Sequence, residues 1–329
     1  MSQHHVLVLQ REQNQIMSYK EEFNKWLIAV DDIDKKILQS MSEEEKQSSF
    51  ECDIDFGTGG IRQLMGLGTN RLNKYTVCKV SLGISHYLNS KKDNNSVVIC
   101  FDNRANSKEF CEVAAKTFAA NDITVYMFDS LRTTPQLSFY TQYLKCDVGI
   151  MITASHNPKE YNGYKVYNRF GGQLINSDAK IVKSYIDKVE NYLNFDFNFD
   201  PKLIHILDEN IDKEYYKEVL KTSILSHNFE NIKVIYSSSH GTGLAPIKYV
   251  LEYKKANLIL VKEQCYPSKT FENTKSPNPE DKASYQLGLK YFIENKADIL
   301  IVTDPDCDRI GCCILDKNNN PYYINGNQM

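Results

Sequence analysis

Long apolar runs are missing from the sequence. None of its 329 residues lies in a run that approaches the roughly 20 apolar residues needed to cross a bilayer. The longest apolar runs, such as residues 148–154, have the length of buried strands. The N-terminus reads MSQHHVLVLQREQ, which has too short an apolar part and no small-residue cleavage site for a signal peptide. We therefore expect no membrane partner and a cytoplasmic location.

Paired cysteine motifs are missing as well. The chain has nine cysteines, an odd number, and no CxxC sequence. Several of them lie in apolar segments, such as Cys100 in SVVICF. The seven histidines are scattered, and none stands at zinc-ligand spacing from a cysteine. This pattern predicts buried free thiols in a reducing compartment rather than disulfides or a zinc site.

Neither sign of charge dominates, and the common phosphate-binding motifs are absent. The 39 Lys and Arg residues nearly balance 42 Asp and Glu residues, for a net charge of −3. This balance gives no electrostatic case for a nucleic-acid partner. The sequence has no GxGxxG, no GxxxxGK and no GxSxG, which argues against dinucleotide-binding, P-loop and hydrolase sites.

The chain does contain an alternation of apolar strands and amphipathic helices. Its length exceeds what one hydrophobic core normally fills, so we expect at least two domains, and the alternation predicts the α/β class. The expected strands are 97–101, 123–128, 148–153, 233–237, 257–262, 298–303 and 311–315. The expected helices are 19–29, 34–47, 73–89, 108–121, 135–145, 212–226, 245–255 and 280–295.

One aromatic and acidic stretch interrupts this alternation. Residues 191–201 read NYLNFDFNFDP, so we place a boundary just after them. The first domain is then 1–205 and the second 206–320. The sequence stops abruptly after PYYINGNQM, which suggests that residues 321–329 begin a further domain.

A serine lies at a point where α/β proteins bind ligands. Residues 148–167 read VGIMITASHNPKEYNGYKVY, and an apolar strand places Ser155 at its carboxyl end. Pro158 and the pair at 162–163 predict tight turns. Because neighbours in an extended loop point apart, His156 is a poor base for Ser155. The residues alone leave open both a nucleophile and a polar turn.

Two glycine-containing turns are candidates for anion contacts. Residues 56–62 read FGTGGIR, whose glycines let the backbone approach an anion, although such turns are also common without a ligand. Residues 237–243 read SSSHGTG. We expect a tight strand-to-helix turn there, with His240 as a hydrogen-bonding loop residue.

Three aspartates follow the predicted strand 298–303. Residues 298–311 read DILIVTDPDCDRIG, and a spacing of two in an extended chain puts Asp304, Asp306 and Asp308 on one face. Their mutual repulsion favours a divalent cation, and oxygen ligands favour Mg²⁺ or Mn²⁺. An EF-hand is excluded, because Arg309 and Leu315 stand where it needs Gly and Glu. A dehalogenase-type phosphatase site fits poorly, and a solvated acidic turn remains the plain alternative.

These segments together resemble the α-D-phosphohexomutase family, from about residue 50 to the end of the chain. TASHNP followed by YNGYKVY resembles the family's active-serine loop, FGTGGIR resembles its FGTxGxR segment, and DPDCDR resembles its DxDxDR metal loop. The continuation GLGTNRLN, at 66–73, is closer to the branch of phosphoglucomutase-2 and the bacterial phosphoglucomutases than to the phosphomannomutases.

The resemblance implies roles for the serine and aspartate loops. Ser155 would be the phosphoserine, Lys165 would move protons during transfer, and His156 would act in the same catalytic loop. Asn157 would shape that loop and help to bind phosphate. The metal ligands would be an oxygen of Ser155 together with Asp304, Asp306 and Asp308.

Further residues would contact or support the phosphate. Arg62 would bind the serine phosphate, with Thr58 as its neighbour in the glycine-rich segment. Arg309 would be a charge partner near the phosphate. The segments 102–104 and 132–135, at the ends of apolar strands, would support the site.

The same resemblance implies a fold and an activity. We expect consecutive α/β domains, each a mixed sheet covered by helices, with the later of the family's usual four domains missing. The expected reaction interconverts glucose 1-phosphate and glucose 6-phosphate, with Mg²⁺ and a glucose 1,6-bisphosphate intermediate. The alternatives are a mutase of mannose or pentose phosphates and an inactive truncated fragment that binds a sugar phosphate. The expected partner is a hexose phosphate substrate. We expect a monomer or weak oligomer.

Overall fold

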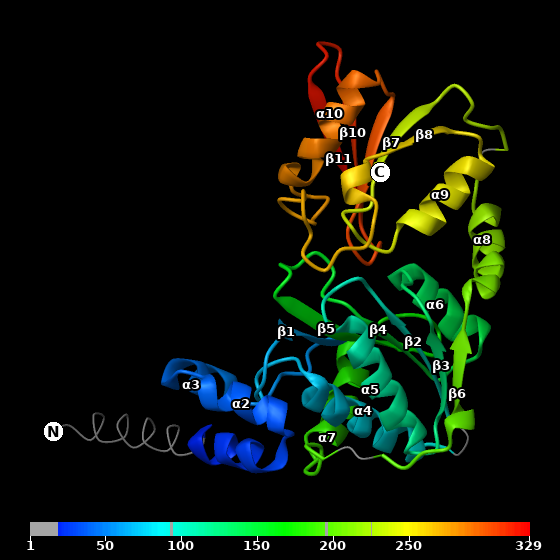
Figure 1. Cartoon of the computed structure of the whole chain (residues 1–329). Helices are drawn as coiled ribbons and strands as arrows, with labels where there is room; N and C mark the ends of the chain where they lie inside the picture. The colour runs from blue at the N-terminus through cyan, green and yellow to red at the C-terminus, as the bar shows by residue number, and fades with distance from the viewer. Residues whose placement is uncertain (1–18, 93–94, 195–196, 225) are drawn as a thin grey trace.

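The computed structural model describes residues 19–92, 95–194, 197–224 and 226–329. The N-terminal segment that was considered as a signal peptide lies outside these ranges. Within them, no helix has both the length and the apolar character needed to span a membrane. Figure 1 shows two sheets, each with its own helices, one above the other and joined along one side through α8 (Asp212–Lys221).

The first sheet has six strands in the order β1-β5-β4-β2-β3-β6. Strands β4, β2, β3 and β6 are parallel, whereas β5 is antiparallel to both β4 and β1. The parallel pairing places the carboxyl ends of β2 and β4 at one edge. The strands are β1 (Gly60–Leu64), β2 (Ser96–Phe101), β3 (Thr124–Phe128), β4 (Val148–Ile152), β5 (Tyr161–Asn168) and β6 (Ile204–Leu207).

Helices cover both faces of this sheet because its central strands are apolar on both sides. Val97 and Ile99 of β2 pack into one buried cluster, and the alternate residues Val98 and Cys100 pack into another. On the first face lie α4 (Lys74–Asn89), α5 (Ser107–Ala119) and α7 (Asn176–Ile186), and on the second lies α6 (Thr134–Tyr143) (Figure 1).

The N-terminal helices form a separate packing unit beside α4. They are the helix at residues 19–29, α2 (Asp32–Ser40) and α3 (Glu43–Phe50). Fully buried Trp26 meets the rings of Phe50 and Tyr75 edge-on. The single helix expected at 34–47 is wrong, because Met41 is extended and Ser42 starts α3 with a capping box to Glu45.

The second sheet has five strands in the order β11-β10-β9-β7-β8. Strands β9, β7 and β8 are parallel, and β10 and β11 are antiparallel additions at one edge. The predicted fold class, mixed sheets covered by helices, is therefore confirmed. The elements are β7 (Lys233–Ser237), α9 (Leu244–Tyr253), β8 (Asn257–Leu260), α10 (Gln286–Glu294), β9 (Ile299–Thr303), β10 (Ile310–Leu315) and β11 (Pro321–Asn325).

The division of the chain at residue 205 stays a prediction, and two strands bear on it. That position falls inside β6, which pairs with β3, so the first sheet runs on to Leu207. Residues 321–325, expected to begin a third domain, instead form β11 of the second sheet and pair with β10.

All seven expected strands are present, with ends that differ by at most two residues. The helices differ more. Helix α8 ends at Lys221, and α10 begins only after a 3-10 turn at Lys282–Tyr285 that Asp281 caps. The nine cysteines, all in described residues, are free thiols, and seven of them are buried, as expected.

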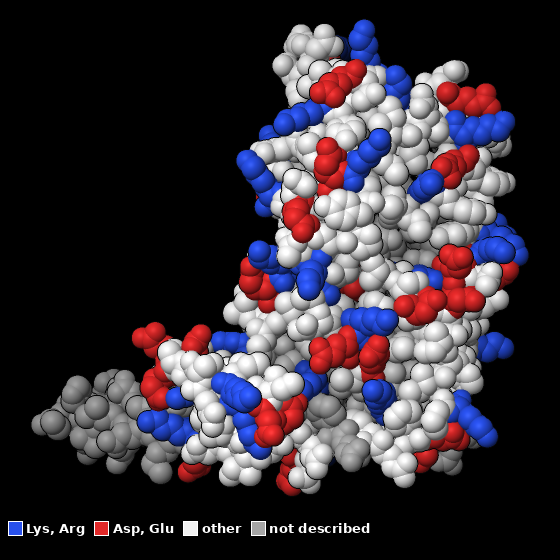
Figure 2. All heavy atoms as spheres, in the orientation of Figure 1, with Lys and Arg blue, Asp and Glu red and all other residues white. Residues whose placement is uncertain are grey.

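Charged side chains of both signs are interspersed over the face drawn in Figure 2. Among the described residues visible there, Lys and Arg do not gather into a stripe of the kind that binds nucleic acid. The view agrees with the near-neutral net charge.

The tight turn expected at 162–163 is wrong, because both residues lie inside β5. Gly163 is required there by close packing rather than by a turn. A Cβ atom at this position would collide with the carbonyl oxygens of Ile61 on β1 and of Thr153, which directly follows β4. β5 can lie between β1 and β4 only with glycine at this point.

We expect Gly163→Ala to lower the free energy of unfolding by about 1–3 kcal/mol, because the sheet must open to accept the methyl group. Urea unfolding measures this change. Gly172→Ala is the matched control, since its nearest atom would be 3.6 Å away. Equal effects of the two substitutions would contradict the packing argument.

Candidate functional site

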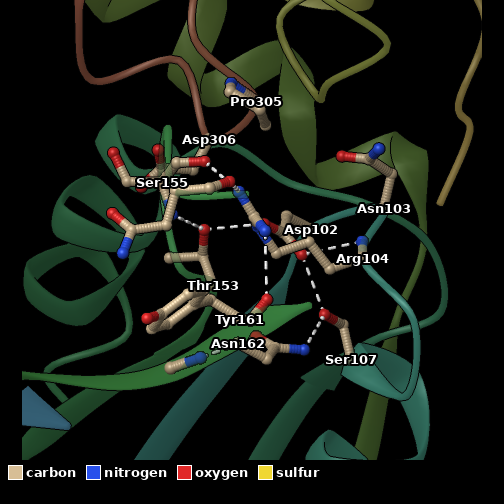
Figure 3. Close-up of polar contacts among 12 residues, drawn as sticks. Asp102, Asn103, Arg104, Ser107, Thr153, Ser155, Tyr161, Asn162, Pro305 and Asp306 are labelled. Carbon is tan, nitrogen blue, oxygen red and sulfur yellow. Dashed lines mark hydrogen bonds and ion pairs between the residues drawn. The ribbon is translucent and has the colours of Figure 1, made fainter. Parts of the chain in front are cut away.

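The serine loop of the first domain meets the aspartate loop of the second (Figure 3). Ser155 lies just beyond β4 and is buried. Its Oγ donates a hydrogen bond of 2.7 Å to Oδ2 of Asp304, which follows β9. The backbone of Ser155 is left-handed, with φ of 56°, a conformation rare for residues other than glycine.

This backbone conformation corrects the expectation for His156. The two side chains do not point apart, because the chain turns at Ser155 instead of continuing as an extended loop. The Nδ1 atom of His156 lies 3.2 Å from the Oγ of Ser155. Burial lowers the pKa of His156, and the charges of Arg309 and Arg62 lower it further.

The three aspartates converge through a turn and not through an extended chain. Cys307 has φ of 56°, and Oδ1 of Asp304 accepts hydrogen bonds from the backbone N–H groups of Asp308 and Arg309, at 3.1 and 3.0 Å. The expected extended geometry is therefore wrong. Asp304, Asp306 and Asp308 nevertheless offer oxygen atoms that all lie within 4.8 Å of one another.

The cluster holds more negative charge than its one buried lysine balances. Lys165 Nζ lies 2.7 Å from Oδ2 of Asp306 and 2.9 Å from Oδ2 of Asp308. Burial raises the pKa of Asp304 well above its usual range, and the charges of Asp306 and Asp308 act in the same direction. Burial also opposes ionisation of Asp306, but the charge of Lys165 and the hydrogen bonds from Asp304, Lys165 and Thr134 together lower that pKa to about 2.

One acceptor of this cluster has no partner among the described residues. Oδ1 of Asp306 is buried and accepts no hydrogen bond. A buried carboxylate oxygen normally has a partner, because its desolvation is costly. An unpaired oxygen beside two further carboxylates fits an oxygen-ligated divalent cation such as Mg²⁺.

The first domain also holds the aspartate loop through the start of α6. The backbone N–H of Thr134 donates to the carbonyl oxygen of Asp306 at 2.9 Å, and its Oγ1 donates to Oδ2 of Asp306 at 2.7 Å. Thr133 caps the same helix with a capping box to Gln136. The sequence indicated only that 132–135 support the site.

Only some of the residues expected to contact phosphate lie close to Ser155. Arg62 of β1 donates from Nη1 to Oδ1 of Asn157 at 3.0 Å, so these two residues are brought together beside Ser155. Thr58 does not join them, because its hydroxyl donates a hydrogen bond to the side chain of Asn176 at the start of α7.

Arg309 borders the cluster from the second domain. Its Nε lies 4.0 Å from Oδ1 of Asp308, and its side chain is 38% exposed. This exposure leaves the guanidinium accessible to an anion. His240 remains a loop residue, as expected, with its ring nitrogens facing the carbonyl oxygens of Tyr266 and Glu272.

Comparisons with known proteins agree with the resemblance read from the sequence. Residues 53–193 match the family model described as phosphoglucomutase/phosphomannomutase, alpha/beta/alpha domain I, and residues 213–317 match the corresponding domain II. The chain belongs to the phosphoglucomutase/phosphomannomutase family, whose members are enzymes of the isomerase class.

Among curated relatives are two staphylococcal phosphoglucomutases. The one from Staphylococcus epidermidis is 40% identical over 93% of this chain and 57% of its own length. The one from Staphylococcus saprophyticus is 41% identical over 90% of this chain and 54% of its own. The chain thus spans about half the length of these relatives.

A solved structure shows the same fold. A Thermus thermophilus protein assigned as a phosphomannomutase superposes with a TM-score of 0.68 at 23% identity, over 80% of this chain and 57% of that chain. At this identity the likeness concerns the fold alone.

We expect Thr134→Val to weaken the contact between the two domains, because the carboxylate of Asp306 loses a donor. The free energy of unfolding should fall by roughly 1–2 kcal/mol. Chemical denaturation measures it, with Thr117→Val as control, since that hydroxyl donates to the carbonyl of Val113 within α5 and lies in the first domain, away from the aspartate loop. An unchanged stability of Thr134→Val would show that this contact does not hold the aspartate loop.

Proposed function

We propose that the chain carries the phosphoryl-transfer site of a phosphoglucomutase, which interconverts glucose 1-phosphate and glucose 6-phosphate. The observation that carries the proposal is the 2.7 Å contact between Ser155 Oγ and Asp304, inside a cluster of three carboxylates. The identity of 40% to a curated phosphoglucomutase supports the choice of sugar. Because the chain spans about half of that relative, the complete activity is itself part of the proposal.

In this proposal, Ser155 and the aspartates Asp304, Asp306 and Asp308 hold Mg²⁺. The ion would offset negative charge on the oxygens of the transferring phosphoryl group. The buried oxygen of Asp306 that lacks a partner supports this assignment. Lys165 keeps two of the carboxylates close together by contacting both.

Ser155 would take part in two transfers. In the first, the 6-hydroxyl oxygen of glucose 1-phosphate attacks phosphorus on phospho-Ser155. The bond from phosphorus to Oγ breaks, and glucose 1,6-bisphosphate forms. In the second, Oγ attacks the phosphate on C1, and glucose 6-phosphate leaves. Positioning of the in-line oxygens supplies most of the catalysis.

Each transfer also moves a proton. The proton of the attacking sugar hydroxyl would pass to an oxygen of the transferring phosphoryl group, and the leaving oxygen must gain a proton. Burial opposes the charge of Lys165, but Asp306 and Asp308 together raise its pKa above the ordinary value, so Lys165 would move protons as an ammonium that donates to the leaving oxygen. When Oγ attacks, its own proton would pass to Nδ1 of His156, which lies 3.2 Å away. Arg62 and Arg309 would contact the phosphate oxygens, and Asn157 would hold Arg62 in place. Thr58 would act through the backbone of its loop.

A test of the metal site is titration with Mn²⁺ as a spectroscopic substitute for Mg²⁺. Asp306→Asn removes one of three charged ligands, so we expect affinity to fall roughly 10- to 100-fold. Asp32→Asn, an exposed aspartate on α2, is the control and should leave affinity unchanged. Equal affinity of Asp306→Asn and the unaltered chain would place the cation elsewhere.

The function itself is tested by peptide mass spectrometry across Ser155. The chain is incubated with glucose 1,6-bisphosphate and Mg²⁺, beside Ser155→Ala and a sample with chelator. We expect phosphate on Ser155, and none on the peptide in the variant or without metal. If phosphate were lacking on Ser155 both in this chain and in a version extended to the length of its relatives, the proposed function would be wrong.

A further inference from the structure

A buried arginine lies beneath the serine loop and binds its main chain. Arg104 follows β2, the parallel neighbour of β4, and its side chain has no exposed surface. Nη2 donates to the carbonyl oxygens of Ser155 and Asn157, both at 2.6 Å. Nη1 donates to those of Pro158 and Tyr161, at 2.8 and 3.0 Å (Figure 3).

These four bonds constrain the loop conformation from beneath. Within the loop itself, the turns are closed by single bonds, such as the one of 3.1 Å from the N–H of Asn157 to the carbonyl oxygen of Ala154. A planar guanidinium presents its donors in a fixed fork, so it sets the directions of several carbonyls at once. The left-handed backbone of Ser155 is stable only if its surroundings hold it.

The arginine is itself held by the carboxylate of Asp102. Oδ2 of Asp102 lies 3.4 Å from Nε of Arg104 and accepts a hydrogen bond of 2.6 Å from the hydroxyl of Thr153. That hydroxyl accepts the N–H of Ser155 at 2.8 Å. The backbone of Ser155 is therefore held at two points. Its N–H is bonded to Thr153, which Asp102 holds, and its C=O is bonded to Arg104.

The second domain covers this arrangement. The ring of Phe271 lies 5.0 Å from the Cζ atom of Arg104, and the side chain of Asn103 donates to the carbonyl oxygen of Ser268 at 2.5 Å. Both contacts come from the segment that follows β8. The guanidinium is thereby excluded from water, which strengthens its hydrogen bonds to the carbonyls.

We propose that Arg104 is a positioning residue for phosphoryl transfer, which fixes the backbone of Ser155 so that Oγ faces Asp304 and the aspartate loop. It reaches none of the reacting atoms, since all four of its bonds to the loop end on carbonyl oxygens. The inference rests on the proposed function for its catalytic consequence, while the conformational role stands on the contacts alone.

The test uses Arg104→Met and Arg104→Lys in the 329-residue chain. Arg104→Met removes all four N–H donors. Arg104→Lys keeps the positive charge but lacks the planar arrangement of donors. Arg71→Met and Arg71→Lys are matched controls, because Arg71 also binds main-chain carbonyls, those of Ser48 and Asn70, but none of the serine loop. All variants are first compared by thermal unfolding.

Two readouts are then taken on each variant. Amide hydrogen exchange of the peptide 153–163 reports the loop conformation without any reaction. The initial rate of Ser155 phosphorylation at increasing glucose 1,6-bisphosphate reports positioning separately from binding. We expect Arg104→Met to speed exchange at least about tenfold. The saturated rate should fall about 100-fold, while the half-saturating concentration changes less than about threefold.

Arg104→Lys should show intermediate values in both readouts, and the Arg71 variants should match the unaltered chain. Unchanged loop exchange in Arg104→Met and Arg104→Lys would overturn the inference. The inference would also be overturned if the phosphorylation rate of Arg104→Lys fell by no more than its fraction of folded protein did. This second criterion applies even if Arg104→Met does not fold. If Ser155 is phosphorylated neither in the unaltered chain nor in the version extended to the length of its relatives, the proposed function fails, and loop exchange alone decides the role of Arg104.

Discussion

The site depends on one hydrogen bond between the two domains, from Ser155 Oγ to Oδ2 of Asp304. Each partner comes from the carboxyl end of a parallel strand, β4 in the first sheet and β9 in the second. The two sheets therefore meet through their ligand-binding edges. The contacts of Lys165 and Thr134 with Asp306 cross the same boundary and keep the two loops in register.

Charge burial sets the chemistry of this interface. Three carboxylates face one buried lysine, and one oxygen of Asp306 has no partner in the described part of the chain. Such a cluster is costly unless a cation joins it. In the proposed function, a cation held by both loops would assist phosphoryl transfer. The same cation would also hold the two domains together.

The sequence predicted the central residues but not their geometry. Apolar strands followed by a serine or by acids were visible, and the family resemblance gave Ser155 and the three aspartates their expected roles. Strand β5 was missed because Asn162 and Gly163 signal a turn in isolation, whereas packing between two strands requires glycine there. The contact of His156 with Ser155 depends on the left-handed φ of Ser155. The role of Arg104 depends on carbonyl groups far along the chain, such as that of Ser155, which is 51 residues away. The local sequence pattern predicts neither contact.

The measurement that tests the central claim most directly is a crystal structure of the chain with Mn²⁺, with the metal located by its anomalous scattering. The account predicts one strong peak among the carboxylates of Asp304, Asp306 and Asp308, with an oxygen of Ser155 in its coordination shell. A peak elsewhere, or an intact cluster with Lys165 still bridging Asp306 and Asp308 and no metal at saturating concentration, would contradict the account.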